Sequence, residues 1–176
     1  MSGDGMERLI EALAWHDNES RAKRAERIAW ASGLYQPPGV VMGRIVPLAL
    51  MEEARICFVN GQFMAAILSA TSVVEHLLVD ELETRGVSGK KGTFKDAIEC
   101  ARKAKAFPVT TPMLDDADQL RQRRNPLVHR NADEGEHSLG ERYLKRQVHP
   151  RTVLEGDARF ALALMYDFFR SVLRAG

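Results

Sequence analysis

The 176-residue sequence lacks the features that mark several common protein classes. Its two cysteines, Cys57 and Cys100, lie far apart and form no C-x-x-C pair, which predicts reduced thiols that serve as small core residues. No apolar stretch approaches the 18 residues of a membrane span, and the N-terminus lacks a charged segment followed by an apolar one. We therefore expect a soluble, cytoplasmic protein that makes no membrane contact.

An excess of charge of either sign is also missing. Lys plus Arg number 25 against 24 Asp plus Glu, which gives a formal net charge of +1. Proteins that coat nucleic acid indiscriminately are usually strongly basic, so any polyanion partner must be met by a local patch. Residues 121–151 hold eight Lys or Arg against four acidic residues. Three arginines there, Arg121, Arg123 and Arg130, are candidate RNA or phosphate ligands, with solvated surface charge as the alternative for each.

Apolar residues recur at helical spacing along almost the whole chain, and no strict alternation long enough for a strand is present. With 45% hydrophobic residues, the chain can bury one domain of this length. The pattern predicts an all-α, up-and-down helical bundle whose neighbouring helices are joined by short turns. Thr93 is expected to cap one helix, Thr110 or Thr111 to start the next, and Thr152 to cap the last. Residues 131–149 are expected to form a mobile loop or a weak helix.

The first 40 residues read as an N-terminal helical extension, and residues 41–176 as the bundle domain. Within the extension, an apolar stripe from Met6 to Leu13 predicts one helix. Asn18 is positioned to cap a second, narrower helix through Ala29, and the Gly- and Pro-rich residues 33–39 then end the pair.

One carboxylate interrupts the apolar stripe of the helix expected from about residue 62 to 84, which we take as the longest in the chain. Glu75 stands between Val74 and Leu78, where an apolar side chain is expected. Since a buried carboxylate is costly unless it is paired or protonated, a basic group is expected to meet it.

The segment RQRRNPLVHR at 121–130 concentrates positive charge around a proline. On an unbroken helix, Arg124 and His129 would point roughly 140° apart, because five residues turn by about 100° each. Pro126 is expected to break the helix at Arg124–Asn125, and Asn125 to cap a restarted segment. Both side chains would then lie beside a fresh helix N-terminus, an arrangement that suits a phosphate.

The motif from Arg124 and Asn125 to His129 resembles the R-x4–6-H signature of HEPN domains (higher eukaryotes and prokaryotes nucleotide-binding). The helix pair from Met51 to Leu78, with Asn60-Gly61 at its turn and Glu75 near its end, is similar to the pair that precedes this motif in many bacterial members. The resemblance covers residues 47–174.

The resemblance implies a metal-independent endoribonuclease that needs no cofactor and whose cleft is shared by a homodimer. His129 would act as general acid or base, Arg124 would stabilise the phosphorane, and Asn125 would orient the phosphate or His129. Glu75 would support Arg124 or His129. A toxin–antitoxin or phage-defence setting with RNA as substrate, and with a possible antitoxin or regulatory partner, is implied in the same way. Two alternatives stay open: a non-catalytic module that binds nucleotides or a protein, and a structural bundle in which the motif is a salt-bridge node.

Overall fold

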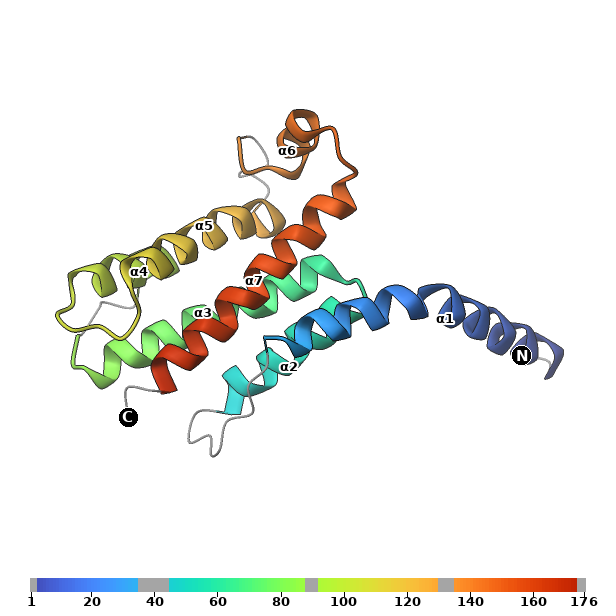
Figure 1. Ribbon diagram of the computed structural model, residues 1–176, viewed down its shortest axis with the longest axis horizontal. Helices are drawn as coiled ribbons and strands as arrows, with labels where there is room; N and C mark the ends of the chain where they lie inside the picture. The colour runs from blue at the N-terminus through green and yellow to red at the C-terminus, as the bar shows by residue number, and fades with distance from the viewer. Residues whose placement is uncertain (1–2, 35–44, 88–91, 130–134, 174–176) are drawn as a thin grey trace. The chain divides into compact units, whose positions relative to one another are not determined.

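A computed structural model of the chain describes residues 3–34, 45–87, 92–129 and 135–173. These ranges contain seven helices and no strand, so the prediction of an all-α protein is confirmed (Figure 1). The helices are α1 (Gly3–Ser32), α2 (Ile45–Val59), α3 (Phe63–Thr84), α4 (Phe94–Lys103), α5 (Thr111–Val128), α6 (Leu139–Arg146) and α7 (Pro150–Leu173). The chain divides into two compact units, one that holds α1 and one that holds α2 to α7. The predicted domain boundary between residues 40 and 41 lies outside the described residues.

Helix α1 is one continuous helix of 30 residues, so the prediction of two helices separated at Asn18 is wrong. No glycine or proline occurs between Met6 and Ser32, and an asparagine inside a helix costs only a fraction of a kcal/mol, about 0.7 at most. Nothing in the local sequence therefore forces an interruption. The apolar stripe of its first half stays solvent-exposed, with Leu13 at 70% exposure.

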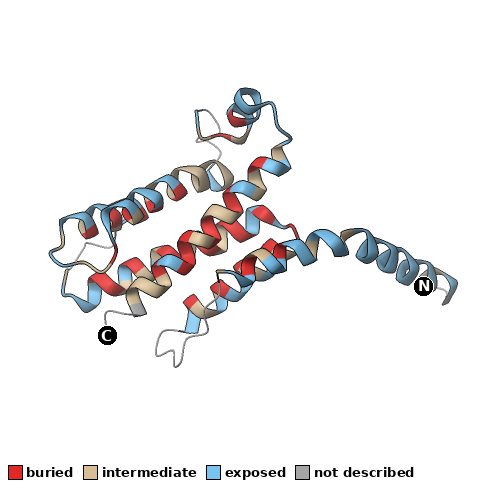
Figure 2. Cartoon of the chain, in the orientation of Figure 1, coloured by how far each residue is buried: buried red, intermediate tan, exposed pale blue. Residues whose placement is uncertain are grey.

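Helix α3 is the central helix of the second unit and packs most extensively against α2 and α7. Its buried residues include Ile67, Val74 and Leu78, as the stripe predicts (Figure 2). At 22 residues α3 is shorter than α7, with 24, and α1, so the expectation that it is the longest is wrong. By length and composition α3 could cross a membrane, but half of its most apolar window is buried inside the protein, as in the core helix of a bundle.

The turn between α2 and α3 forms at Asn60–Gly61 as predicted, with Gly61 at a φ of 74°. A positive φ is strained for residues that carry a Cβ, which explains the glycine. Arg151, near the start of α7, fixes this turn from the side. Its guanidinium donates to the Gly61 carbonyl at 3.3 Å and lies 5.2 Å from the centre of the Phe63 ring.

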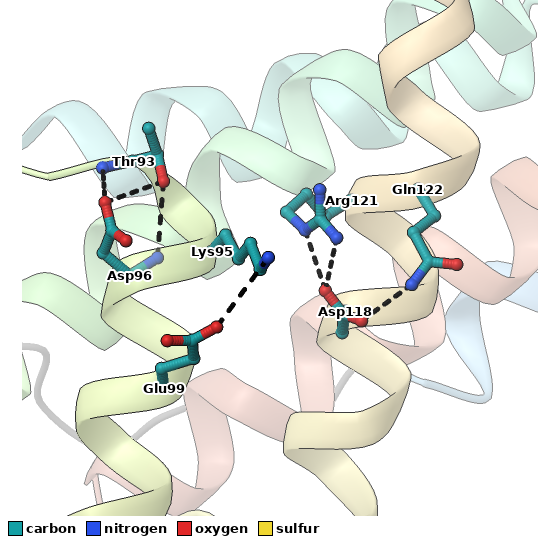
Figure 3. Close-up of polar contacts among 7 residues, drawn as sticks. All are labelled: Thr93, Lys95, Asp96, Glu99, Asp118, Arg121 and Gln122. Carbon is teal, nitrogen blue, oxygen red and sulfur yellow. Dashed lines mark hydrogen bonds and ion pairs between the residues drawn. The ribbon is translucent and has the colours of Figure 1, made fainter. Parts of the chain in front are cut away.

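The start of α4 is a capping box built from Thr93 and Asp96 (Figure 3). The Thr93 N–H donates to the Asp96 carboxylate at 2.8 Å, and the Asp96 N–H donates to the Thr93 hydroxyl at 3.4 Å. The backbone hydrogen bond and that of the Thr93 hydroxyl hold the pKa of Asp96 below its usual value. The predicted cap at Thr93 is therefore confirmed.

A loop or a weak helix is expected over residues 131–149, and the part of this segment that the structure describes, from residue 135, contains a short helix. Within it Ser138 caps the eight-residue helix α6, since its hydroxyl accepts a hydrogen bond from the Glu141 N–H at 3.2 Å. Helix α7 starts at Pro150 instead of after Thr152, because a proline is well suited to the first turn of a helix. The Nδ1 of His149 accepts a hydrogen bond from the Arg151 N–H at 3.1 Å and caps this end.

Candidate functional site at the C-terminal end of α5

Helix α5 runs without interruption through Pro126 to Val128, so the predicted break at Arg124–Asn125 is wrong. The Pro126 ring has no N–H, which leaves the carbonyl of Gln122 without its usual helical donor. The next turn still closes, because the N–H of His129 donates to the Asn125 carbonyl at 2.9 Å. Within the described residues no new helix N-terminus forms between Arg124 and His129, so the phosphate site expected from such an end is not formed by α5.

Arg124 and His129 lie on this uninterrupted helix and its C-cap. Arg124 is half-buried, whereas His129 is exposed and extended, with φ −116° and ψ 117°. Neither side chain forms a hydrogen bond or an ion pair with a described residue. Five helical steps direct the two side chains roughly 140° apart, so α5 does not aim them at one small group within a single chain.

Asn125 is engaged by its own helix. With its amide oriented to satisfy both atoms, the side-chain nitrogen donates to the Arg121 carbonyl at 3.2 Å, and the side-chain oxygen accepts from the Arg121 guanidinium at 3.3 Å. Arg121 also pairs with Asp118 at 2.8 Å, and Gln122 donates to the other oxygen of that carboxylate (Figure 3). Arg121 and Asn125 thus form one polar chain along α5.

Glu75, the carboxylate expected to support the motif, is half-buried on α3. It forms no ion pair with a described residue, so the predicted basic partner is not found among them. Partial exposure explains why no partner is needed, because water can solvate the carboxylate. Arg130, the remaining predicted ligand, lies outside the described residues.

A buried salt-bridge node does exist nearby, at different residues. Asp157 of α7 accepts hydrogen bonds from the two terminal nitrogens of Arg142 of α6, at 2.5 and 2.6 Å. Arg123 of α5 donates to the same carboxylate at 3.2 Å and lies 4.6 Å from the centre of the Phe160 ring. The side chains of Arg123, Arg142 and Asp157 are 20%, 10% and 5% exposed. Arg123 is therefore a link between helices and is not the freely solvated charge that the sequence left as one alternative.

The sequence contained a signal for this node. Asp157 stands between Val153 and Ala161 on the buried stripe of α7, just as Glu75 interrupts the stripe of α3. The rule that singled out Glu75 applies more strongly to Asp157, which is 4% exposed. Arg142 is one of the eight basic residues of 121–151, and nothing near it in the sequence marks it as the partner of Asp157.

Several basic side chains lie close enough to Arg123 to affect its pKa. Burial lowers the pKa of Arg123, the charge of Asp157 opposes that shift, and the charges of Arg142 and Arg146 add to it. In addition, Lys145 and Arg146 form no ion pair with any residue in the described ranges. These basic side chains of α5 and α6 can attract an anion.

The described residues contain no group of three or more His, Cys, Asp or Glu side chains arranged to hold a metal ion. Cys57 and Cys100 are free thiols, and burial followed by the nearby charge of Glu53 raises the pKa of Cys57. Comparison with known proteins gives no match, whether with a family model, a curated protein or a solved structure.

Proposed function

We propose that the chain is a metal-independent endoribonuclease of HEPN type, in which Arg124 and His129 act on RNA in a cleft completed by a second copy. The proposal rests on a difference in side-chain contacts between neighbouring residues at the C-terminal end of α5. Arg123 contacts Asp157, whereas the side chains of Arg124 and His129 have no partner among the described residues. An arginine and a histidine left unpaired at a positively charged surface are available to a ligand.

The second copy follows from the geometry of α5. Side chains directed roughly 140° apart do not converge on one phosphate within one chain. A symmetric pair of chains can bring Arg124 of one copy beside His129 of the other. Such a pairing also accords with the homodimer that the HEPN resemblance implies.

The proposed reaction is transfer of an RNA phosphodiester to its own ribose. His129 accepts the proton of the 2′-hydroxyl, and the 2′-oxygen forms a bond to the adjacent phosphorus. The bond to the 5′-oxygen breaks, and the imidazole of the same His129, now protonated, donates the proton that this oxygen takes up. Arg124 stabilises the negative charge of the phosphorane, so that the products carry a 2′,3′-cyclic phosphate and a 5′-hydroxyl.

The other site residues take supporting parts in this proposal. Asn125, whose amide contacts Arg121, orders the last turns of α5 and so positions the neighbouring Arg124. Tyr143, which is 41% exposed on α6, is available to stack on a base. A toxin–antitoxin or defence setting, with an antitoxin as partner, rests on the resemblance alone.

A non-catalytic binding module is the second candidate. The uninterrupted α5 favours it, because a helix that keeps Arg124 and His129 apart can bind a nucleotide without bringing acid, base and phosphate together. The endoribonuclease and the binding module would use the same surface, and only the endoribonuclease would cleave RNA.

Cleavage of mixed RNA in EDTA tests the proposal. The parent protein is compared with Arg124→Ala and His129→Ala, and with Lys105→Ala as a control that removes an exposed cation outside α5. We expect cleavage by the parent and the control, with cyclic phosphate ends, and at least about 100-fold loss in the two site variants. Equal cleavage by all four proteins would point to another site or a contaminant. Absence of cleavage by the folded parent would favour the binding module.

A further inference from the structure

The buried node has more positive than negative charge. Both oxygens of Asp157 are occupied by Arg142, at 2.5 and 2.6 Å. Arg123 reaches only one of them, at 3.2 Å, and its other terminal nitrogen donates to the neutral amide oxygen of Gln119 at 2.8 Å. Two guanidinium groups thus share one carboxylate, and Arg123 is the less neutralised of the two.

A third arginine adds to the imbalance. Arg146 follows Arg142 by four residues on α6, which places both on nearly the same face of that helix. Burial is the main cause that lowers the pKa of Arg123, and the charges of Arg142 and Arg146 lower it further. Arg146 has no ion-pair partner among the described residues, so no carboxylate there neutralises its charge.

We propose that Arg123 and Arg146 form a phosphate-binding site between α5 and α6. An oxyanion held there would supply the negative charge that the node lacks, and two guanidinium groups offer it planar pairs of donors. Arg123 is held in place by Asp157, Gln119 and the ring of Phe160, so one half of the site is ordered before the ligand arrives. Arg146, at the exposed end of α6, supplies the other half.

The site lies one residue before Arg124 along α5 and deepens the function proposed above. The phosphate-binding site depends on the proposed function in one respect, the source of its phosphate. That source would be a phosphodiester of the RNA backbone next to the one that is cleaved. A free phosphate ion or a terminal phosphomonoester has the same chemistry. Binding of phosphate at Arg123 and Arg146 does not itself require cleavage.

Calorimetric titration of the full chain at constant ionic strength tests the inference. The two probes are inorganic phosphate and uridylyl-uridine, which has one phosphodiester and no terminal phosphate. Arg146→Gln removes the proposed ligand, and Lys145→Gln is the matched control, because it removes an equal charge from the neighbouring position on α6. Both residues are exposed, so neither change disturbs the core.

We expect phosphate to bind the parent and the control with affinities within about twofold, and Arg146→Gln about tenfold more weakly, as loss of one charge-assisted hydrogen bond predicts. Binding of uridylyl-uridine in competition with phosphate would identify the backbone as the source, whereas binding of phosphate alone would identify a free or terminal phosphate. Equal weakening in both variants, or no binding of either probe by the parent, would overturn the site. RNA cleavage is measured in a separate assay. Failure of the phosphate-binding site and failure of the ribonuclease proposal can therefore be told apart.

Discussion

The carboxylate of Asp157 on α7 accepts hydrogen bonds from both terminal nitrogens of Arg142 on α6. It also accepts one from Arg123 on α5, so this buried carboxylate connects three helices. Helix α6 has only eight residues and carries a single buried side chain, that of Arg142. This contact therefore determines where α6 lies relative to α5 and α7.

Replacing Asp157 by Asn should strongly destabilise the fold. The change leaves the buried Arg142 and the half-buried Arg123 without a carboxylate, and breaking a buried ion pair costs about 3–5 kcal/mol of unfolding free energy. Asp167→Asn on the same helix is the control, because that carboxylate pairs with Arg170 at a position that is 49% exposed. Its loss should cost less than about 1 kcal/mol. Urea unfolding of both variants measures the difference, and equal costs would contradict the structural role assigned to the node.

Thr93→Ala should weaken the start of α4. The substitution removes the hydroxyl that accepts the Asp96 N–H, and loss of a threonine cap typically costs about 1 kcal/mol. Thr110→Ala provides a matched control, since Thr110 precedes α5 at the same N-cap position but makes no side-chain cap hydrogen bond. We expect the control to have a smaller effect on the thermal midpoint. A cost for Thr110→Ala as large as that for Thr93→Ala would argue against the capping box.

Pro126→Ala should stabilise the protein, by about 1–2 kcal/mol, because the alanine N–H restores the hydrogen bond to the Gln122 carbonyl. Pro112→Ala is the control. Pro112 lies in the first turn of α5, where a proline costs little, so its replacement should be neutral or slightly destabilising. Denaturant midpoints compare the two variants. If Pro126→Ala destabilises the protein more than Pro112→Ala does, the result would indicate that α5 is interrupted at Pro126 in solution, as the sequence predicts.

The part of the fold that could be predicted depends on local chemistry. The capping box at Thr93, the turn at Asn60–Gly61 and the buried stripe of α3 each follow from residues close together in the sequence, whose effects no distant contact opposes. The predicted division of α1 at Asn18 is wrong because the capping preference of asparagine is weak and no glycine or proline lies near it to end a helix.

The candidate site was harder to predict because it depends on contacts between helices. Pro126 was expected to end α5, yet only one helical hydrogen bond is lost there and the rest of the helix is retained. The pairing of Arg142 with Asp157 links residues 15 apart and could not be told from many other Arg and Asp combinations. Which carboxylate needs a partner depends on burial, and this distinguishes Asp157 from the half-exposed Glu75.

The most direct test of the account is RNA cleavage in EDTA by an equal mixture of Arg124→Ala and His129→Ala chains, compared with each variant alone and with the parent. In a mixed pair, the first variant supplies His129 and the second supplies Arg124, so one complete site is rebuilt. We expect both variants alone to be inactive and the mixture to recover about a quarter of the parent activity, because half of the pairs are mixed and each has one of two sites. A mixture as inactive as its components, beside an active parent, would contradict a site shared between two copies.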